Sequence, residues 1–216
     1  MLVNRWLALC EEIGLDGRAG WALLSSAYGD PARAYHNLNH IRDCLLRLDE
    51  HAHLAVDLPA VELAIWFHDI VYDPRAADNE ERSAAVAAEF LAAAPLGALV
   101  ADLIRDTKHD SPPRTRDAEL LCDIDLGILG RSPNKYDSYA RAIREEYAWV
   151  PLPQYAEART RMLEGFLARP AIFVLDELQE LFGEQARANL TREILSLAEP
   201  LPDYPDRLEP DNGSLS

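Results

Sequence analysis

The chain has 216 residues, of which 49% are hydrophobic and 27% are charged, and its formal net charge at pH 7 is −16. These values predict a soluble globular protein with one substantial core. They disfavour nucleic acid as a partner, because binding a phosphate backbone requires a basic surface and the sequence contains no stripe rich in Lys and Arg.

Signals for targeting or membrane insertion are also missing from the sequence. No apolar run approaches the roughly 20 residues that a membrane-spanning helix requires, and residues 1–14 do not resemble a signal peptide. The three cysteines form an odd set without CxxC spacing, which disfavours a disulfide framework. We therefore expect a cytoplasmic protein without a membrane partner, whereas no pattern indicates its oligomeric state.

Helical signals dominate, because apolar residues recur at spacings of three and four and Leu, Ala, Glu and Arg are abundant. We expect an all-α, single-domain helical bundle over residues 1–198, with the C-terminal helices packed on the core. The proline-rich tail at residues 199–216 is expected to be irregular or disordered. In chain order, the predicted helices span about residues 3–14, 18–28, 37–53, 59–72, 79–94, 96–109, 116–129, 134–149, 153–168 and 184–198.

Two of these helices carry more detailed expectations. The segment DNEERSA predicts a capping box, with Asp78 as the N-cap and Glu81 reaching back to it. In the helix at 134–149, an aromatic stripe predicts core packing, and Arg144 and the neighbouring glutamates are expected on a solvated face. The stripe consists of Tyr136, Tyr139, Ile143 and Tyr147.

Carboxylates interrupt two apolar runs that are otherwise suited to a buried core. LAIWFHDIVY, residues 63–72, contains His68 and Asp69, and LLCDIDLGILG, residues 120–130, contains Asp123 and Asp125. An ionised carboxylate in apolar surroundings destabilises a fold by several kcal/mol unless it is paired. Neither run contains Lys or Arg, so a bound divalent cation is an economical explanation.

Histidines provide further candidate ligands. His36 and His40 are four residues apart and share a face if the backbone is helical there, and His109 follows another apolar helix. A mixed set of nitrogen and oxygen ligands is typical of sites for Mn, Fe, Co, Ni, Zn or Mg, and it differs from the thiolate ligands of structural zinc sites. The alternative is structural: a single core histidine is more often hydrogen-bonded than a ligand, and Asp123 alone could cap a turn.

The order of these residues resembles a known signature. His40, then His68-Asp69, then an aspartate 56 residues later are similar to the H…HD…D pattern of the HD superfamily of metal-dependent phosphohydrolases. The resemblance covers about residues 1–198 and is greatest to a bacterial branch of predicted HD phosphohydrolases, with which it shares YHNLNHI, WFHDIVYDP, DNEERSA, DIDLGILG and IREEY. YHNLNH is also similar to the YHNxxH motif of class I cyclic-nucleotide phosphodiesterases.

The resemblance implies an HD-type helical bundle that holds one divalent metal ion. The implied ligands are His40, His68, Asp69 and Asp125, and Asp123 is the alternative to Asp125. Members with two metals usually carry further histidines where this chain has Asn79-Glu80, so one ion is expected. The implied reaction is hydrolysis of a phosphoester or phosphoanhydride of a small phosphorylated molecule, in the first place a nucleotide, by a metal-activated water.

The catalytic assignments follow from the same resemblance. His36 is the candidate general acid for the leaving group, and Glu80 or Asp73 would orient or deprotonate the water. Candidate second-sphere or substrate contacts are Asp123, Asn79, His109 and Arg144. Candidate phosphate contacts are Arg82, Lys108, Arg141 and Arg144, and the alternative for each is an ordinary surface cation. Two other classes of function stay open: a metal-containing module that senses a nucleotide without cleaving it, and a helical interaction protein without a metal.

Overall fold

The computed structural model describes residues 2–198, and the predicted irregular tail lies outside them. Within these residues all regular structure is helical, which confirms the predicted all-α class. The helices are α1 (Leu2–Glu12), α2 (Gly17–Tyr28), α3 (Leu38–Glu50), α4 (Leu58–Phe67), α5 (Asn79–Phe90), α6 (Gly97–Asp106), α7 (Arg116–Asp125), α8 (Pro133–Glu146), α9 (Leu152–Leu167) and α10 (Asp176–Ala198), with the 3₁₀ helices η1 (Ala52–Leu54) and η2 (Leu126–Gly130). Of the described helices, none combines the length and the apolar character that crossing a membrane requires.

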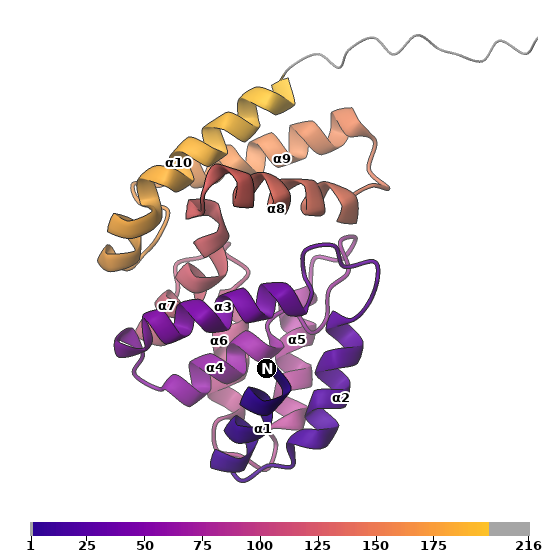
Figure 1. Ribbon diagram of the computed structural model, residues 1–216, viewed down its shortest axis with the longest axis vertical. Coiled ribbons are helices and arrows are strands. Elements are labelled where there is room, and N and C mark those ends of the chain that lie inside the picture. Colours follow the sequence, from indigo (N-terminus) through magenta and orange to yellow (C-terminus); the bar gives the residue numbers. More distant parts are fainter. Residues whose placement is uncertain (1, 199–216) are drawn as a thin grey trace, which may run out of the picture.

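The helices form two groups that share one core (Figure 1). Helices α1, α2, α3, α5 and α6 surround α4. Most residues of α4 are apolar and buried, so this helix occupies the centre of its bundle. Helices α8, α9 and α10 lie together beyond α7, and both α8 and α10 pack on η2. Buried side chains run without interruption from Trp66 through Leu129 to Leu163 and Leu178, so the C-terminal helices pack on the core as predicted.

The end of α4 differs from the predicted boundary. The helix stops at Phe67 rather than near residue 72, so His68 and Asp69 lie in the turn that follows it. Arg33 stabilises this turn, because its guanidinium donates to the backbone carbonyl of Asp69 at 2.6 Å and to that of Ile70 at 3.0 Å. These bonds supply partners for carbonyl groups that a continuing helix would otherwise satisfy.

The beginning of α10 also differs, because the helix starts at Asp176 rather than near residue 184. The backbone N–H groups of Val174 and Leu175, just before the helix, both donate to the carboxylate of Asp123 at 2.8 Å. This bond pair anchors the start of α10 to α7. Asp123 is 51 residues away from Val174, so no local pattern in the sequence indicates the boundary.

The predicted capping box at α5 is wrong. Asp78 makes no side-chain cap bond, and Glu81 pairs instead with Arg105 of α6 at 3.0 Å. The entry to α5 is fixed by Asn79, whose side chain accepts from the N–H of Asp73 at 3.0 Å and donates to its carbonyl at 2.9 Å. Two hydrogen bonds from the amide side chain of Asn79 thus hold the loop that leads into the helix.

Candidate metal centre and cavity

Three helix termini bring the candidate ligands together. His40 lies in the first turn of α3, where the side chain of Asn37 caps the helix by accepting from the N–H of Asn39. His68 and Asp69 follow the last residue of α4, and Asp125 is the last residue of α7. His40 and His68 are 4% and 2% exposed, so both imidazoles are buried beneath the half-buried carboxylates.

The ligand atoms lie around one point. Nε2 of His40 is 3.0 Å from Nε2 of His68, and Oδ1 of Asp125 is 3.2 Å and 3.6 Å from the same two nitrogens. Oδ2 of Asp69 is 3.1 Å from Nε2 of His68 and 3.5 Å from Nε2 of His40. Two atoms that each lie about 2.1 Å from one ion at a right angle are about 3.0 Å apart. The group of His40, His68 and Asp125 could therefore hold a metal ion.

The chemistry of the donors fits a cation. Nδ1 of His68 lies 2.9 Å from the carbonyl oxygen of Ile65, and because a carbonyl only accepts, Nδ1 carries the proton. In the neutral ring, Nε2 then directs its lone pair toward the other ligands. Within residues 2–198, neither Asp69 nor Asp125 forms an ion pair with Lys or Arg. The centre thus gathers acceptors that no cationic side chain neutralises.

The pKa values reflect this crowding of acceptors. Burial alone would raise the pKa values of Asp69 and Asp125, but the neighbouring histidines outweigh it and hold both below their usual range. Burial lowers the pKa of His40, whereas at His68 the carboxylates outweigh burial and raise the pKa well above the ordinary value. A cation at this centre would compete with a proton for the lone pair of Nε2 of His68.

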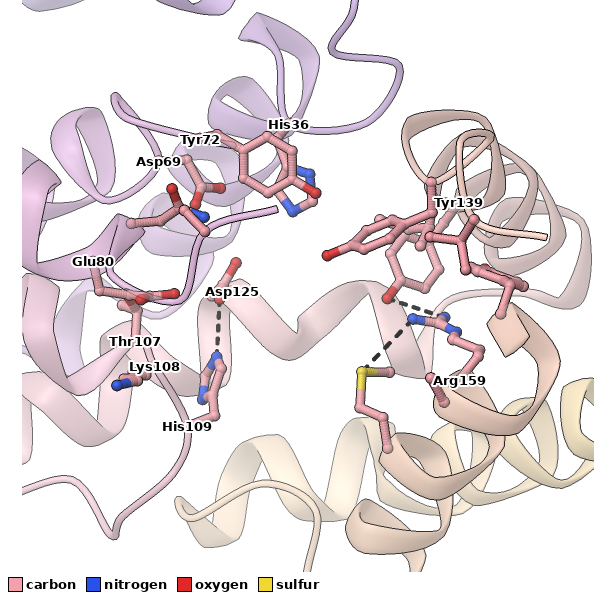
Figure 2. Close-up of a pocket in the computed structure, with 18 residues that line it drawn as sticks. His36, Asp69, Tyr72, Glu80, Thr107, Lys108, His109, Asp125, Tyr139 and Arg159 are labelled. Atoms are coloured by element: carbon pink, nitrogen blue, oxygen red, sulfur yellow. Dashed lines mark hydrogen bonds and ion pairs between the residues drawn. The ribbon is translucent and has the colours of Figure 1, made fainter. Parts of the chain in front are cut away.

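His109 orients one of the candidate ligands. Its Nε2 lies 3.0 Å from Oδ2 of Asp125 (Figure 2). Oδ1 of that carboxylate is therefore left facing the two buried histidines. The backbone of His109 has φ = 57°, a left-handed conformation that is uncommon for residues other than glycine. Arg169 donates to its carbonyl at 3.0 Å and helps to hold this conformation. Backbone strain of this kind is concentrated at functional sites.

His36 is held by a carboxylate that the sequence prediction placed on a solvated face. Glu146 is only 7% exposed, so that prediction is wrong. Its Oε2 lies 2.7 Å from Nδ1 of His36 and accepts from the hydroxyl of Tyr72 at 3.0 Å, while Oε1 accepts from the backbone N–H groups of Tyr35 and His36. The Tyr72 ring also stacks on His36, with 3.9 Å between the ring centroids.

This network affects both the pKa and the orientation of His36. Burial alone would lower the pKa of the imidazole, but Asp69 and Glu146 outweigh it and raise the pKa above its ordinary value. Within the described chain, no hydrogen bond involves Nε2 of His36. The ring is thus fixed through Nδ1 and has its second nitrogen free at the wall of the cavity.

A cavity of about 520 Å³ lies over the candidate metal centre. His36, Asp69 and Asp125 line it together with Asn79 and Glu80 from the start of α5. Figure 2 shows Glu80, Lys108 and His109 on the same side of the cavity as Asp125, with Tyr139 and Arg159 on the opposite side. Tyr72, Tyr139 and Arg159 were not identified from the sequence, because an aromatic residue or an arginine in a helix is equally compatible with core packing or a solvated face.

Apart from the two buried histidines, the candidate residues that do not line this cavity are Asp73, Asp123, Arg144, Arg82 and Arg141. The carboxylate of Asp73 accepts from the N–H of Arg75 at 2.9 Å, and Arg144 donates to two backbone carbonyls of the loop after α8. Asp123 is fully buried with both oxygens bonded at the start of α10, and burial raises its pKa to about 6. Of the two aspartates in DIDLGILG, it is therefore Asp125 that faces the histidines.

No protein-family model, curated protein or solved structure matches the chain.

Proposed function

We propose that the protein is a metal-dependent phosphohydrolase of the HD type that cleaves a phosphoester or phosphoanhydride of a small molecule, in the first place a nucleotide. One observation carries the proposal: two buried imidazole nitrogens and two carboxylate oxygens, separated by 3.0–3.6 Å in their contacts, face one another beneath a cavity. The order of these residues in the sequence supports the same reaction class.

His40, His68, Asp69 and Asp125 would hold one divalent ion. When bound, such an ion lowers the pKa of a coordinated water and polarises a phosphoryl oxygen. His68 contributes Nε2 because its Nδ1 is engaged with Ile65, and Asp125 contributes Oδ1 because its Oδ2 is engaged with His109. These second bonds fix the orientation of the ligands, which is the usual role of groups surrounding a metal site.

His36 is the proton donor for the leaving oxygen. The carboxylate of Glu146 fixes the imidazole through Nδ1 and raises its pKa, which favours the protonated ring that a general acid requires. Glu80 lines the cavity from the first turn of α5, where we assign it the task of orienting the attacking water. Lys108 lines the same cavity and supplies a positive charge for the phosphate group.

The proposal is tested on the purified full chain supplied separately with Mn²⁺, Co²⁺, Ni²⁺, Zn²⁺ or Mg²⁺. Phosphate release from phosphomonoesters, nucleotides and cyclic nucleotides is measured for the parent chain, for His68→Ala and for His53→Ala. His53 is a matched control because its side chain is 61% exposed and its ring hydrogen-bonds, among the described residues, only to Glu177. We expect metal-dependent turnover that His68→Ala abolishes and His53→Ala retains.

Two results would contradict the proposal. In the first, no ion supports turnover of any compound. In the second, turnover occurs but is unchanged in His68→Ala. A nucleotide that binds to the metal-loaded protein and is recovered intact would instead favour a sensing module.

A further inference from the structure

The cavity has two chemically different ends. The end over the candidate metal centre carries the carboxylates and histidines described above. The other end is formed by α8, α9 and the loop between them, and its walls are mostly aromatic or aliphatic: Tyr139, Ile143, Tyr147, Val150, Tyr155 and Met162. A phosphate group and its metal need only the first end. The second end is therefore available for the organic part of a substrate.

The walls of the second end suit a flat, weakly polar group. All acidic residues that line the cavity, Asp69, Glu80 and Asp125, belong to the metal end. The volume of about 520 Å³ is within the range of pockets that enclose an organic ligand rather than a bare anion. Aromatic side chains bind planar rings by stacking, and a sugar or an alkyl chain that carries no planar ring gains less binding energy from them.

Tyr139 adds one directed polar group to these walls. Its hydroxyl oxygen accepts from Nη2 of Arg159 at 3.3 Å, so its own hydrogen must point elsewhere, and no other described residue accepts it. Arg159 is fixed in turn by Glu193, which binds its Nε at 2.8 Å and its Nη2 at 3.2 Å. The Tyr139 ring packs edge-on against Tyr35, with 4.7 Å between centroids, so the hydroxyl is rigidly placed.

We propose that the α8–α9 end of the cavity binds the part of the leaving group that lies farthest from the phosphate, and that this part is a planar heterocycle with a hydrogen-bond acceptor, the chemical class of the nucleobases. Tyr139 is the specificity-determining residue, because its ring provides a stacking or edge contact and its O–H donates to the acceptor. This inference rests on the proposed function and narrows its substrate class.

The test compares the four nucleoside 5′-monophosphates AMP, GMP, CMP and UMP with ribose 5-phosphate, which carries the same phosphoester without a base. Values of kcat/KM are measured for the full chain loaded with the most active metal. We expect the best nucleotide to exceed ribose 5-phosphate by about tenfold to a hundredfold, the range that stacking of one base on an aromatic side chain supplies. Equal values for ribose 5-phosphate and all four nucleotides would overturn the inference.

Two variants examine the subsite without altering the candidate metal ligands. Tyr139→Phe keeps the ring and removes the hydroxyl, and Ala158→Leu fills part of the α8–α9 end from an exposed position of α9. Each is expected to raise KM for the preferred nucleotide severalfold or more and to leave ribose 5-phosphate unchanged. Gly165→Leu is the control, because it adds a side chain to α9 where an added Cβ meets no atom within 4 Å.

Failure of the subsite and failure of the proposed function give different results. If both variants change nucleotide and ribose 5-phosphate turnover equally, or change neither, the subsite is wrong and the hydrolase stands. If no metal supports hydrolysis, the proposed function is wrong. The subsite is then tested by measuring the affinities of the same five compounds by calorimetry. Nucleotide binding at least tenfold tighter than that of ribose 5-phosphate, and weakened by Tyr139→Phe, supports it; equal or absent binding overturns it.

Discussion

Nε2 of His40 faces Nε2 of His68 at 3.0 Å, although the two residues are 28 positions apart and lie at the ends of different helices. Two imidazole lone pairs at this distance repel each other unless a proton or a cation lies between them. The nearby oxygens of Asp69 and Asp125 add negative charge to the same point. A divalent ion between these atoms would remove all of these repulsions, and this is the main physical reason for inferring a metal centre.

Metal binding should stabilise the fold measurably. A ligand that binds only the native state at a hundredfold excess over its Kd raises the free energy of unfolding by about 2.7 kcal/mol. We expect Mn²⁺ or Co²⁺ to raise Tm in the parent chain, and Asp125→Asn to lose most of this rise. Asp43→Asn on α3, where the side chain is 46% exposed, is the control. Equal metal-induced shifts in the parent and Asp125→Asn would argue against a role for Asp125.

His109 should influence metal affinity without being a ligand. His109→Asn removes the imidazole that engages Oδ2 of Asp125, and Asn tolerates the left-handed backbone found at this position. Loss of a side chain that orients a ligand typically weakens metal binding by about tenfold to a hundredfold. Titration calorimetry with Mn²⁺ should show this loss with the stoichiometry unchanged. An affinity equal to that of the parent would show that Asp125 needs no such partner.

Substitutions of Asp123 and Asp125 should affect different properties, the stability of the fold for Asp123 and metal binding for Asp125. Asp123→Ala leaves the N–H groups of Val174 and Leu175 without their acceptor at the start of α10. Each unsatisfied buried group destabilises a fold by about 1–3 kcal/mol, so for these two groups we expect denaturant unfolding to report a loss of about 2–6 kcal/mol. Metal affinity, measured below the unfolding transition, should stay within a few-fold of the parent. A complete loss of metal binding by folded Asp123→Ala would contradict this division.

Glu146 should set the alkaline limit of activity. Since burial lowers the pKa of His36 and Asp69 and Glu146 raise it, removing the Glu146 charge lowers that pKa. A general acid is lost as pH rises through its pKa, so Glu146→Gln should move the alkaline limb of kcat/KM to lower pH. Glu145→Gln, at the adjacent exposed position, is the control. An alkaline limb that stays in place in Glu146→Gln would exclude His36 as the proton donor.

The sequence was sufficient to predict the all-α class and the convergence of its unusual residues. The helical class follows from local periodicity, which extends over most of the chain. The carboxylates within apolar runs predicted that His68, Asp69 and either Asp123 or Asp125 share a partner, and His68, Asp69 and Asp125 do lie together. Both the helical periodicity and the carboxylates within apolar runs are visible in short stretches of sequence. The first reflects the burial of one helix face, and the second reflects the need of a buried charge for a partner.

Long-range partners were not predictable in the same way. Glu146 lies 110 residues from His36 and has the surroundings of a surface glutamate in the sequence, yet it is buried by its bonds to Tyr35 and His36. The start of α10 depends on Asp123, and the end of α4 depends on Arg33. Tertiary hydrogen bonds of this kind override local propensity, because one buried bond to a charged group outweighs the preference of a residue or two for a helix.

We expect one divalent ion to be held between His40, His68, Asp69 and Asp125. Anomalous diffraction from crystals grown with Mn²⁺ would locate this ion without reference to activity. The expected result is a single strong peak within about 2.4 Å of Nε2 of both histidines and of an oxygen from each carboxylate. No peak at this point, or a peak bound by other residues, would contradict it.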